Sequence, residues 1–159
     1  MQRADLAHGA DVTTATRREP SLLYAIKQVE LVVRSHLDDI LKQSGVTAIQ
    51  YTALTVLRRR DGLTSAQLAR NSFVKTQSMA DLVAALERGE LISRRRDPAD
   101  ARRILISLTD KGRQVLRDYD EPVRALEQRM VERLTLKQTR DLRHALNVCR
   151  EALADEPAH

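Results

Sequence analysis

Apolar residues recur every three or four positions over most of the chain, which is the pattern of amphipathic α-helices. A first helix is expected to follow Ser21, which can cap it, and to end near Gly45. Its apolar positions are Leu22, Ile26, Val29, Val33, Leu37 and Ile40. Three more helix starts carry a capping box, a threonine followed three residues later by a glutamine, at Thr47–Gln50, Thr64–Gln67 and Thr135–Gln138. They predict helices from 48 to about 60, over 65–72 and from 136 to about 154.

The pattern changes in the middle of the chain. Thr76 is expected to cap a helix over 77–88, whose apolar stripe is Met79, Leu82, Val83 and Leu86. Residues 91–94 then predict a strand, and a second strand follows in which Ile104, Ile106 and Leu108 alternate with Arg103, Leu105 and Ser107, so that one face is buried. The stretch RRRDPADARR, residues 94–103, is therefore the tip and flanks of a β-hairpin. Thr109 and Asp110 begin a long helix, and Pro122 predicts a kink or a break inside it.

Composition supports a globular, mainly helical chain. It has 159 residues, of which 42% are hydrophobic and 31% charged, with only five glycines and four prolines. No apolar run is long enough to cross a bilayer, and the first 20 residues lack the apolar core of a signal peptide, which predicts a cytoplasmic protein without membrane partners. Residues 1–20 have mixed polarity and no period, so a flexible arm is expected there.

The positive charge is concentrated in one part of the sequence. Residues 58–113 hold 13 Lys and Arg against 7 Asp and Glu, a net +6, whereas the rest of the chain has 14 against 15, a net −1. A basic central segment suggests a partner with dense negative charge, nucleic acid first, although a solvated basic face is the alternative. The elements expected over this segment are a helix-turn-helix followed by a hairpin, which is a winged helix.

In a helix-turn-helix the start of the second helix meets base edges in the major groove. The residues at that start are Lys75, Thr76, Gln77 and Ser78, which are suited to bases and phosphates. Arginines on adjacent strands repel one another, and double-stranded DNA along the wing would remove that cost. We therefore expect the wing to contact DNA, with Arg102 in the minor groove. The wing arginines are Arg94, Arg95, Arg96, Arg102 and Arg103. Arg70, on the supporting helix, is expected to contact the DNA backbone. Asp97 and Asp100 are expected to pair with neighbouring arginines and stiffen the loop.

Two motifs at this spacing resemble the MarR family of transcriptional regulators. DPADARRILISLTDKG, residues 97–112, is similar to the family's wing signature, and TQSMADLVAALE, residues 76–87, to its recognition helix. The resemblance extends from about 21 to 153 and implies a homodimer on a pseudopalindromic operator, with repression as the usual outcome. It implies dimerisation segments at 21–45 and 113–159 around a winged module at 46–112. The apolar stripes of the terminal helices, too long for one small module to cover, also call for a partner.

One detail departs from the family pattern. The family usually continues its recognition helix with Leu-Glu-x-x-Gly-Leu-Ile, whereas this chain has LERGELI, with Gly89 one position early and Glu90 where glycine is expected. Either the helix ends one residue sooner, or Glu90 takes the left-handed conformation at a cost of about 1 kcal/mol.

The resemblance also implies a small anionic or phenolic effector bound between the dimer layer and the winged module. Candidate contacts on the first two helices are Arg34, His36, Gln50 and Tyr51. The lone Cys149 lies at helical spacing with apolar residues and is expected to pack as a small hydrophobe, a redox sensor being the alternative. No metal cluster, cofactor motif or nucleophile motif occurs, so an enzyme is not expected. The rival function is a winged helix used for protein–protein contact, which would not need basic residues on both strands of the wing.

Overall fold

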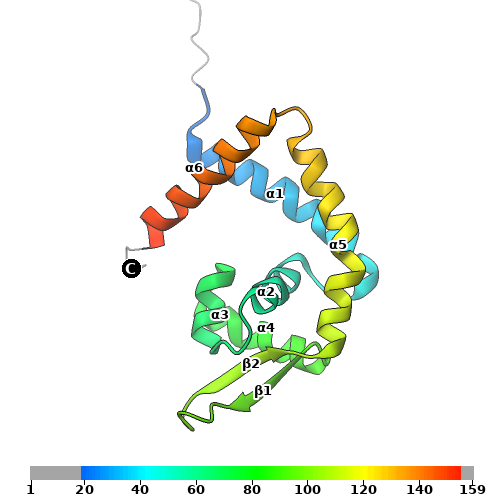
Figure 1. The fold of residues 1–159 in the computed structure, drawn as a ribbon, viewed down its shortest axis with the longest axis vertical. Helices are drawn as coiled ribbons and strands as arrows, with labels where there is room; N and C mark the ends of the chain where they lie inside the picture. Colours follow the sequence, from blue (N-terminus) through cyan, green and yellow to red (C-terminus); the bar gives the residue numbers. More distant parts are fainter. Residues whose placement is uncertain (1–18, 155–159) are drawn as a thin grey trace, which may run out of the picture.

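The computed structural model describes residues 19–154, and all but the last two residues of the expected N-terminal arm lie outside this range. Within it, helices α1 (Leu22–Leu41), η1 (Lys42–Ser44), α2 (Ala48–Arg59), α3 (Ser65–Ser72) and α4 (Thr76–Arg88) precede the strands β1 (Ile92–Arg96) and β2 (Ile104–Leu108). Helices α5 (Asp110–Val131) and α6 (Leu136–Ala154) follow. The structure therefore confirms a mainly helical chain with one β-hairpin. Figure 1 shows α2, α3, α4 and the hairpin as one module, with α1, α5 and α6 extending from it.

The helix starts follow from local hydrogen bonding. The capping boxes at Thr47 and Thr64 are both complete, and Thr135 and Gln138 exchange the same pair of bonds, at 2.9 and 3.2 Å. The prediction for Thr76 is wrong by one residue. Lys75 is the extended N-cap residue of α4, and no side chain caps the first backbone N–H groups of that helix. The amphipathic stripe located the helix correctly, but the turn before it determines the residue at which the helical conformation begins.

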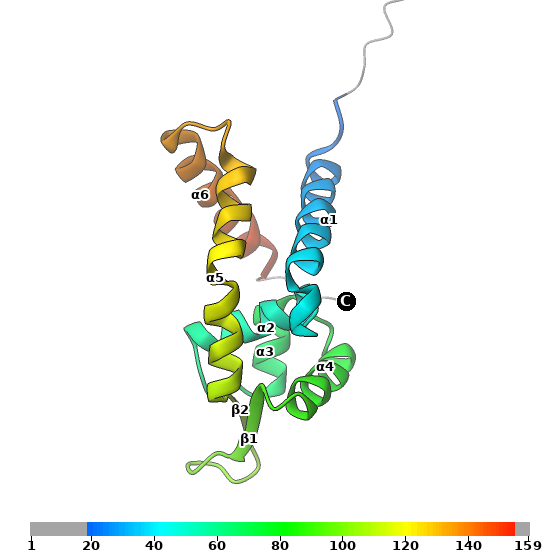
Figure 2. The same ribbon diagram turned by 90° about the vertical axis from the view of Figure 1, so that its right-hand side faces the viewer.

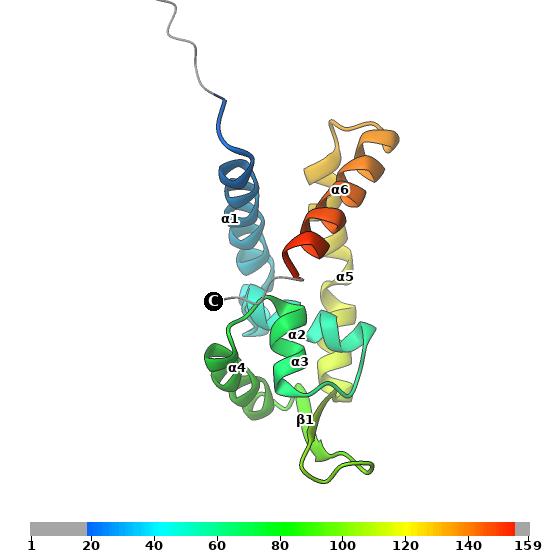
Figure 3. The same ribbon diagram turned by 90° about the vertical axis from the view of Figure 1, so that its left-hand side faces the viewer.

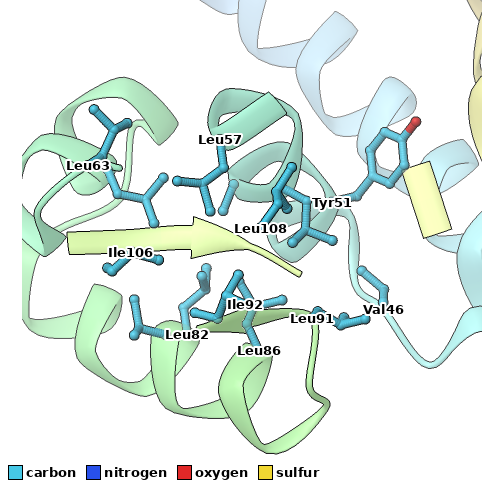
Figure 4. Close-up of a cluster of buried hydrophobic side chains, with 14 of the residues drawn as sticks. Val46, Tyr51, Leu57, Leu63, Leu82, Leu86, Leu91, Ile92, Ile106 and Leu108 are labelled. Atoms are coloured by element: carbon cyan, nitrogen blue, oxygen red, sulfur yellow. The ribbon is translucent and has the colours of Figure 1, made fainter. Parts of the chain in front are cut away.

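The core lies among α2, α3, α4, the hairpin and the first half of α5 (Figure 4). Leu54, Leu57, Met79 and Leu86 are at most 1% exposed, so the stripes predicted for α2 and α4 do face inward. Leu63 extends the hairpin by one backbone bridge, donating to the Ile106 carbonyl at 3.2 Å and accepting from its N–H at 2.8 Å. The bridge fixes the hairpin against the start of α3.

The alternation predicted for the second strand is only partly right. Ile106 and Leu108 are buried as expected, but Ser107 is also buried and Ile104 is 43% exposed. The reason is that β2 contacts α2, α3 and α5, so its inner half is enclosed on more than one side. Ile104 pairs with Arg96 in the last rung before the loop at the tip of the hairpin, where the strands extend away from the core.

The junctions around the hairpin explain the family-like motif at its base. Glu90 has φ 60°, so of the two expected alternatives the left-handed Glu90 is the one that occurs. Gly89 keeps a helical φ of −74°. Thr109 caps α5, donating its hydroxyl to the Glu90 carbonyl at 2.7 Å and its N–H to the Leu91 carbonyl at 3.2 Å. Helix α5 continues through Pro122 without a break. Pro122 is exposed, so solvent can satisfy the carbonyl that lacks a helical donor.

The long helices leave much apolar surface uncovered. Figure 2 shows α1 and α5 rising together from the winged module, with the hairpin projecting at the opposite end. Large apolar side chains on α1 and α6 are exposed, including Leu22 at 71%, Leu23 at 77% and Leu136 at 83%. One chain therefore does not bury the stripes that the sequence places on its terminal helices. No helix among the described residues is long and apolar enough to span a bilayer.

Candidate nucleic-acid interface

The N-terminus of α4 is open to solvent. Lys75, Thr76, Gln77 and Ser78 are all exposed, and the next residue, Met79, is fully buried and anchors this turn in the core. Lys75 precedes the helix in an extended conformation, and its side chain cannot accept a hydrogen bond. The first N–H groups of α4 thus remain available to an external acceptor. Helix N-termini with such free groups bind anions, and phosphate in particular.

The hairpin divides the arginines between two faces. Arg94 pairs with Ile106 and Arg96 with Ile104, so both lie on the face that carries Ile92 and Leu108 into the core. Arg95 pairs with Leu105 and lies on the opposite face. Because successive side chains of a strand point to opposite faces, the three consecutive arginines cannot all enter one DNA groove.

Arg94 forms an ion pair with Glu87 of α4, which connects the hairpin to α4. The hydrogen bond from the Arg94 guanidinium lowers the pKa of the Glu87 carboxyl, and the same bond raises the pKa of Arg94. Sequence reasoning missed Glu87 because its partner is seven residues away across a turn, a spacing with no helical or strand signature. Arg94 thus has a partner within the protein, unlike Arg95 and Arg102, which form no ion pair with any described residue.

The loop at the tip of the wing is organised by its two aspartates. Asp97 accepts from the backbone N–H of Ala99 at 2.9 Å and lies 3.5 Å from the guanidinium of Arg103. Asp100 accepts from the backbone N–H of Arg102 at 3.0 Å, so its contact is with the backbone of that arginine and not with its guanidinium. Three backbone bonds within residues 97–103 close the loop further. The result is a compact tip from which the Arg102 side chain projects into solvent.

The structure groups some predicted contact residues and separates another. Helix α4 and the hairpin belong to the winged module, at the opposite end of the molecule from the turn between α5 and α6, and α4 runs from the α3–α4 turn towards the base of the hairpin (Figures 2 and 3). Arg70 lies elsewhere, lining a cavity between α3 and the C-terminal part of α6.

The four effector candidates do not converge on one pocket. Arg34 forms an ion pair with Glu30 and lines a cavity of about 360 Å³ between α1, α2 and the end of α3. The ring of His36 lies 3.4 Å from the Arg129 guanidinium, between α1 and α5. Gln50 is held in the capping box with Thr47. Tyr51 is buried, and its pKa is raised by burial and then by the nearby Asp120 carboxylate.

The Arg34 cavity has a feature that the sequence did not indicate. Ser72 lines it, is 5% exposed, and has a buried hydroxyl that finds no hydrogen-bond partner among residues 19–154. Phe73 lies beside it with φ 56° and is 76% exposed. Phe73 is the left-handed residue that ends α3, and this conformation directs its ring outward. The pKa of Glu30 is lowered by the hydrogen bond from Lys27 and then by the one from Arg34.

Other candidate chemistry is limited among residues 19–154. Cys149 is a free, exposed thiol on α6, and the apolar residues at helical spacing from it, Leu142, Leu146 and Leu153, are exposed too, so a single chain does not bury this helix face. The described residues contain no group of three or more His, Cys, Asp or Glu side chains arranged to hold a metal ion.

Comparison with known proteins points to one family. The model of the MarR family matches residues 44–103. The HTH-type transcriptional repressor Rv2887 of Mycobacterium tuberculosis is 30% identical over 123 residues, which cover 77% of this chain and 88% of that protein.

Solved structures agree in fold. The Staphylococcus aureus MepR–DNA complex is similar with a TM-score of 0.75 and 25% identity, covering 84% of this chain and 99% of that one. Mycobacterium tuberculosis Rv2887 in complex with salicylic acid has a TM-score of 0.66 and 29% identity, covering 83% of this chain and 98% of that one.

Proposed function

Since the chain belongs to the MarR family of DNA-binding transcriptional regulators, which are not enzymes, we propose that it is a repressor that binds a pseudopalindromic operator as a homodimer. The observation that carries the proposal is the presence of two features on the same winged module. The start of α4 is exposed and lacks a side-chain cap, and the tip of the wing carries Arg102, which is exposed and forms no ion pair with any described residue. A family relative with a similar fold is known in complex with DNA.

The two features suit different parts of a duplex. The polar residues at the start of α4, Thr76, Gln77 and Ser78, would meet base edges in the major groove, and Lys75 would neutralise a phosphate. Arg102 would enter the minor groove, where narrow stretches attract arginine. Arg95, Arg96 and Arg103 would contribute mainly phosphate contacts. Arg94 would act through Glu87 by keeping the wing at a fixed angle to α4.

The apolar surface of the long helices supports a homodimer. The exposed side chains on α1 and α6 lie within the segments 21–45 and 113–159, to which the sequence assigned dimerisation. A second copy that covers them would present a second winged module. Two such modules bind half-sites about 34–36 Å apart, one turn of the duplex.

The Arg34 cavity supports the existence of an effector. The Arg34 guanidinium lines it and can bind a carboxylate or phenolate in place of Glu30. A relative is known in complex with salicylic acid, a small anionic phenol. A ligand there would contact both α1 and the winged module, and could therefore change the spacing of the two recognition helices.

Selection from a random duplex library tests the proposal. We expect an inverted repeat with half-sites one helical turn apart to be enriched, and fluorescence anisotropy to show tighter binding to that duplex than to a scrambled one. Arg102→Ala should weaken binding to the enriched duplex. If no sequence is enriched and both duplexes bind equally and weakly regardless of Arg102, the module serves another purpose, and a protein partner becomes the better explanation.

A further inference from the structure

A second, strongly basic cavity lies between the helix-turn-helix and α6. It has a volume of about 630 Å³ and is bounded by α2, α3 and the C-terminal part of α6, which approach one another in Figures 1 and 3. Four arginines line it: Arg59 and Arg60 at the end of α2, Arg70 on α3 and Arg150 on α6. None of these residues belongs to the recognition helix or to the wing.

The positive charge in this cavity is not balanced by the protein. The lining contains no acidic residue. Arg59, Arg60 and Arg70 form no ion pair with any residue in the range 19–154, and Arg150 pairs only with its exposed neighbour Glu151, at 3.3 Å. Guanidinium groups that converge without counter-charges repel one another, and the repulsion is relieved when an anion lies between them.

We propose that this cavity is a binding site for a small anion that carries two or more negative charges of the phosphate or carboxylate type. Guanidinium groups bind both kinds of oxyanion through paired hydrogen bonds. The volume lies within the range of about 300–1,000 Å³ typical of small-molecule pockets. The amide of Asn147 lies on the same wall as Arg150, and the exposed ring of Phe73 offers a flat apolar surface to an organic part of the ligand.

The backbone phosphates of DNA are the other source of the same chemistry. A duplex is too wide to enter a concavity of about 630 Å³ that is bounded by both α3 and α6. Arg150 in particular belongs to α6 and lies across the cavity from the helix-turn-helix. The geometry therefore favours a small ligand, and the experiment below distinguishes the two sources.

An anion in this cavity would connect α3 to α6, and so the helix-turn-helix to a dimerisation segment. If the proposed function holds, this connection implies that the anion changes the affinity of the protein for the operator. DNA then changes the affinity of the protein for the anion by the same factor. The anion site itself does not depend on that function, because it is defined by groups that bind without DNA.

Isothermal titration of the full-length protein with inorganic pyrophosphate tests the site, with citrate as the carboxylate probe at matched ionic strength. We expect one anion per chain, and a loss of about tenfold or more in affinity for Arg70→Gln and for Arg150→Gln. Arg133→Gln removes an equal charge from the exposed turn between α5 and α6 and should bind as the wild type does. Circular dichroism of each variant confirms that it is folded.

Different results would overturn different parts of this proposal. Equal binding by Arg133→Gln and the cavity variants, or no binding of either probe by the wild type, would remove the site. Loss of duplex affinity in both cavity variants without anion binding would assign these arginines to DNA. If pyrophosphate binds but operator affinity is unchanged, only the coupling between anion and DNA binding is rejected. If the protein binds no operator at all, the proposed function is rejected, but the calorimetric evidence for the anion site stands.

Discussion

Gly112→Ala tests how closely the start of α5 packs against the base of the wing. A Cβ atom at this position would lie 2.1 Å from the carbonyl oxygen of Leu91 and 3.2 Å from a side-chain carbon of Leu108. The nearer contact is with backbone, so no change of rotamer relieves it. Contacts of a Cβ atom below 3.0 Å are essentially never seen, so the helix and the Leu91 carbonyl must separate by about 0.9 Å.

The expected loss is about 2 kcal/mol in the free energy of unfolding. Overpacking of this kind costs roughly 1–3 kcal/mol, and the better helix propensity of alanine returns at most about 1 kcal/mol. The separation would also stretch the bond from the Thr109 N–H to the Leu91 carbonyl, which is already 3.2 Å long. For a chain of this size, about 2 kcal/mol corresponds to a fall in Tm of roughly 4–8 °C.

Urea unfolding at equal protein concentrations measures the effect, with Gly89→Ala as the matched control. A Cβ at Gly89 would meet nothing nearer than 3.5 Å, and its backbone is helical, so this variant should differ from the wild type by less than about 0.5 kcal/mol. If Gly112→Ala were as stable as Gly89→Ala, the close approach of α5 to Leu91 would not exist in solution.

Three further predictions concern single sites. Glu90→Gly should raise the free energy of unfolding by about 0.5–1 kcal/mol, because the residue has φ 60° and its exposed contact with Lys111 contributes little; an unchanged urea midpoint would contradict a left-handed Glu90. Thr64→Ala should lower it by about 1 kcal/mol through loss of the capping box of α3, and should leave the unfolding midpoint clearly below that of Thr139→Ala, a threonine with no capping role. Burial, and then the Asp120 carboxylate, raise the pKa of Tyr51 in the folded protein. The contribution of the neutral Tyr51 to the free energy of unfolding is therefore complete below the ordinary pKa of about 10, and it is lost as the pH rises through the folded-state value. Absorbance titration should show one tyrosine ionising after the others, and simultaneous ionisation of all three would argue against a buried Tyr51.

The sequence predicted the elements whose signals are local. Thr47 and Thr64 cap helices because the hydrogen bonds that define the motif span three residues, a separation visible in the sequence. The change from helical to alternating periodicity located the hairpin. The shifted glycine predicted one of two local changes, and the left-handed Glu90 is the one that occurs. The family was identified from the spacing of two such local motifs.

Features set by tertiary packing were not visible. Ser107 is buried because β2 is enclosed by three helices, a fact that alternation along one strand cannot express. The Glu87–Arg94 ion pair joins two elements across a turn, and its spacing matches no regular period. The effector candidates were chosen because they lie on the first two helices, without regard to which helix face carries them. Gln50 is in fact part of the capping box of α2, and Tyr51 is buried in the core. The backbone contact expected of Arg70 was likewise assigned from its helix alone, and the structure places Arg70 in the cavity between α3 and α6.

The salt dependence of duplex affinity tests the central claim most directly, that the arginine wing contacts DNA. For the enriched duplex, the logarithm of affinity should fall steeply with the logarithm of salt concentration, and Arg102→Ala should reduce this slope by about two, roughly one for each copy in a homodimer. Arg133→Ala, far from the wing, should leave the slope unchanged. A slope near zero for the wild type, or one that Arg102→Ala and Arg133→Ala alter equally, would contradict the account.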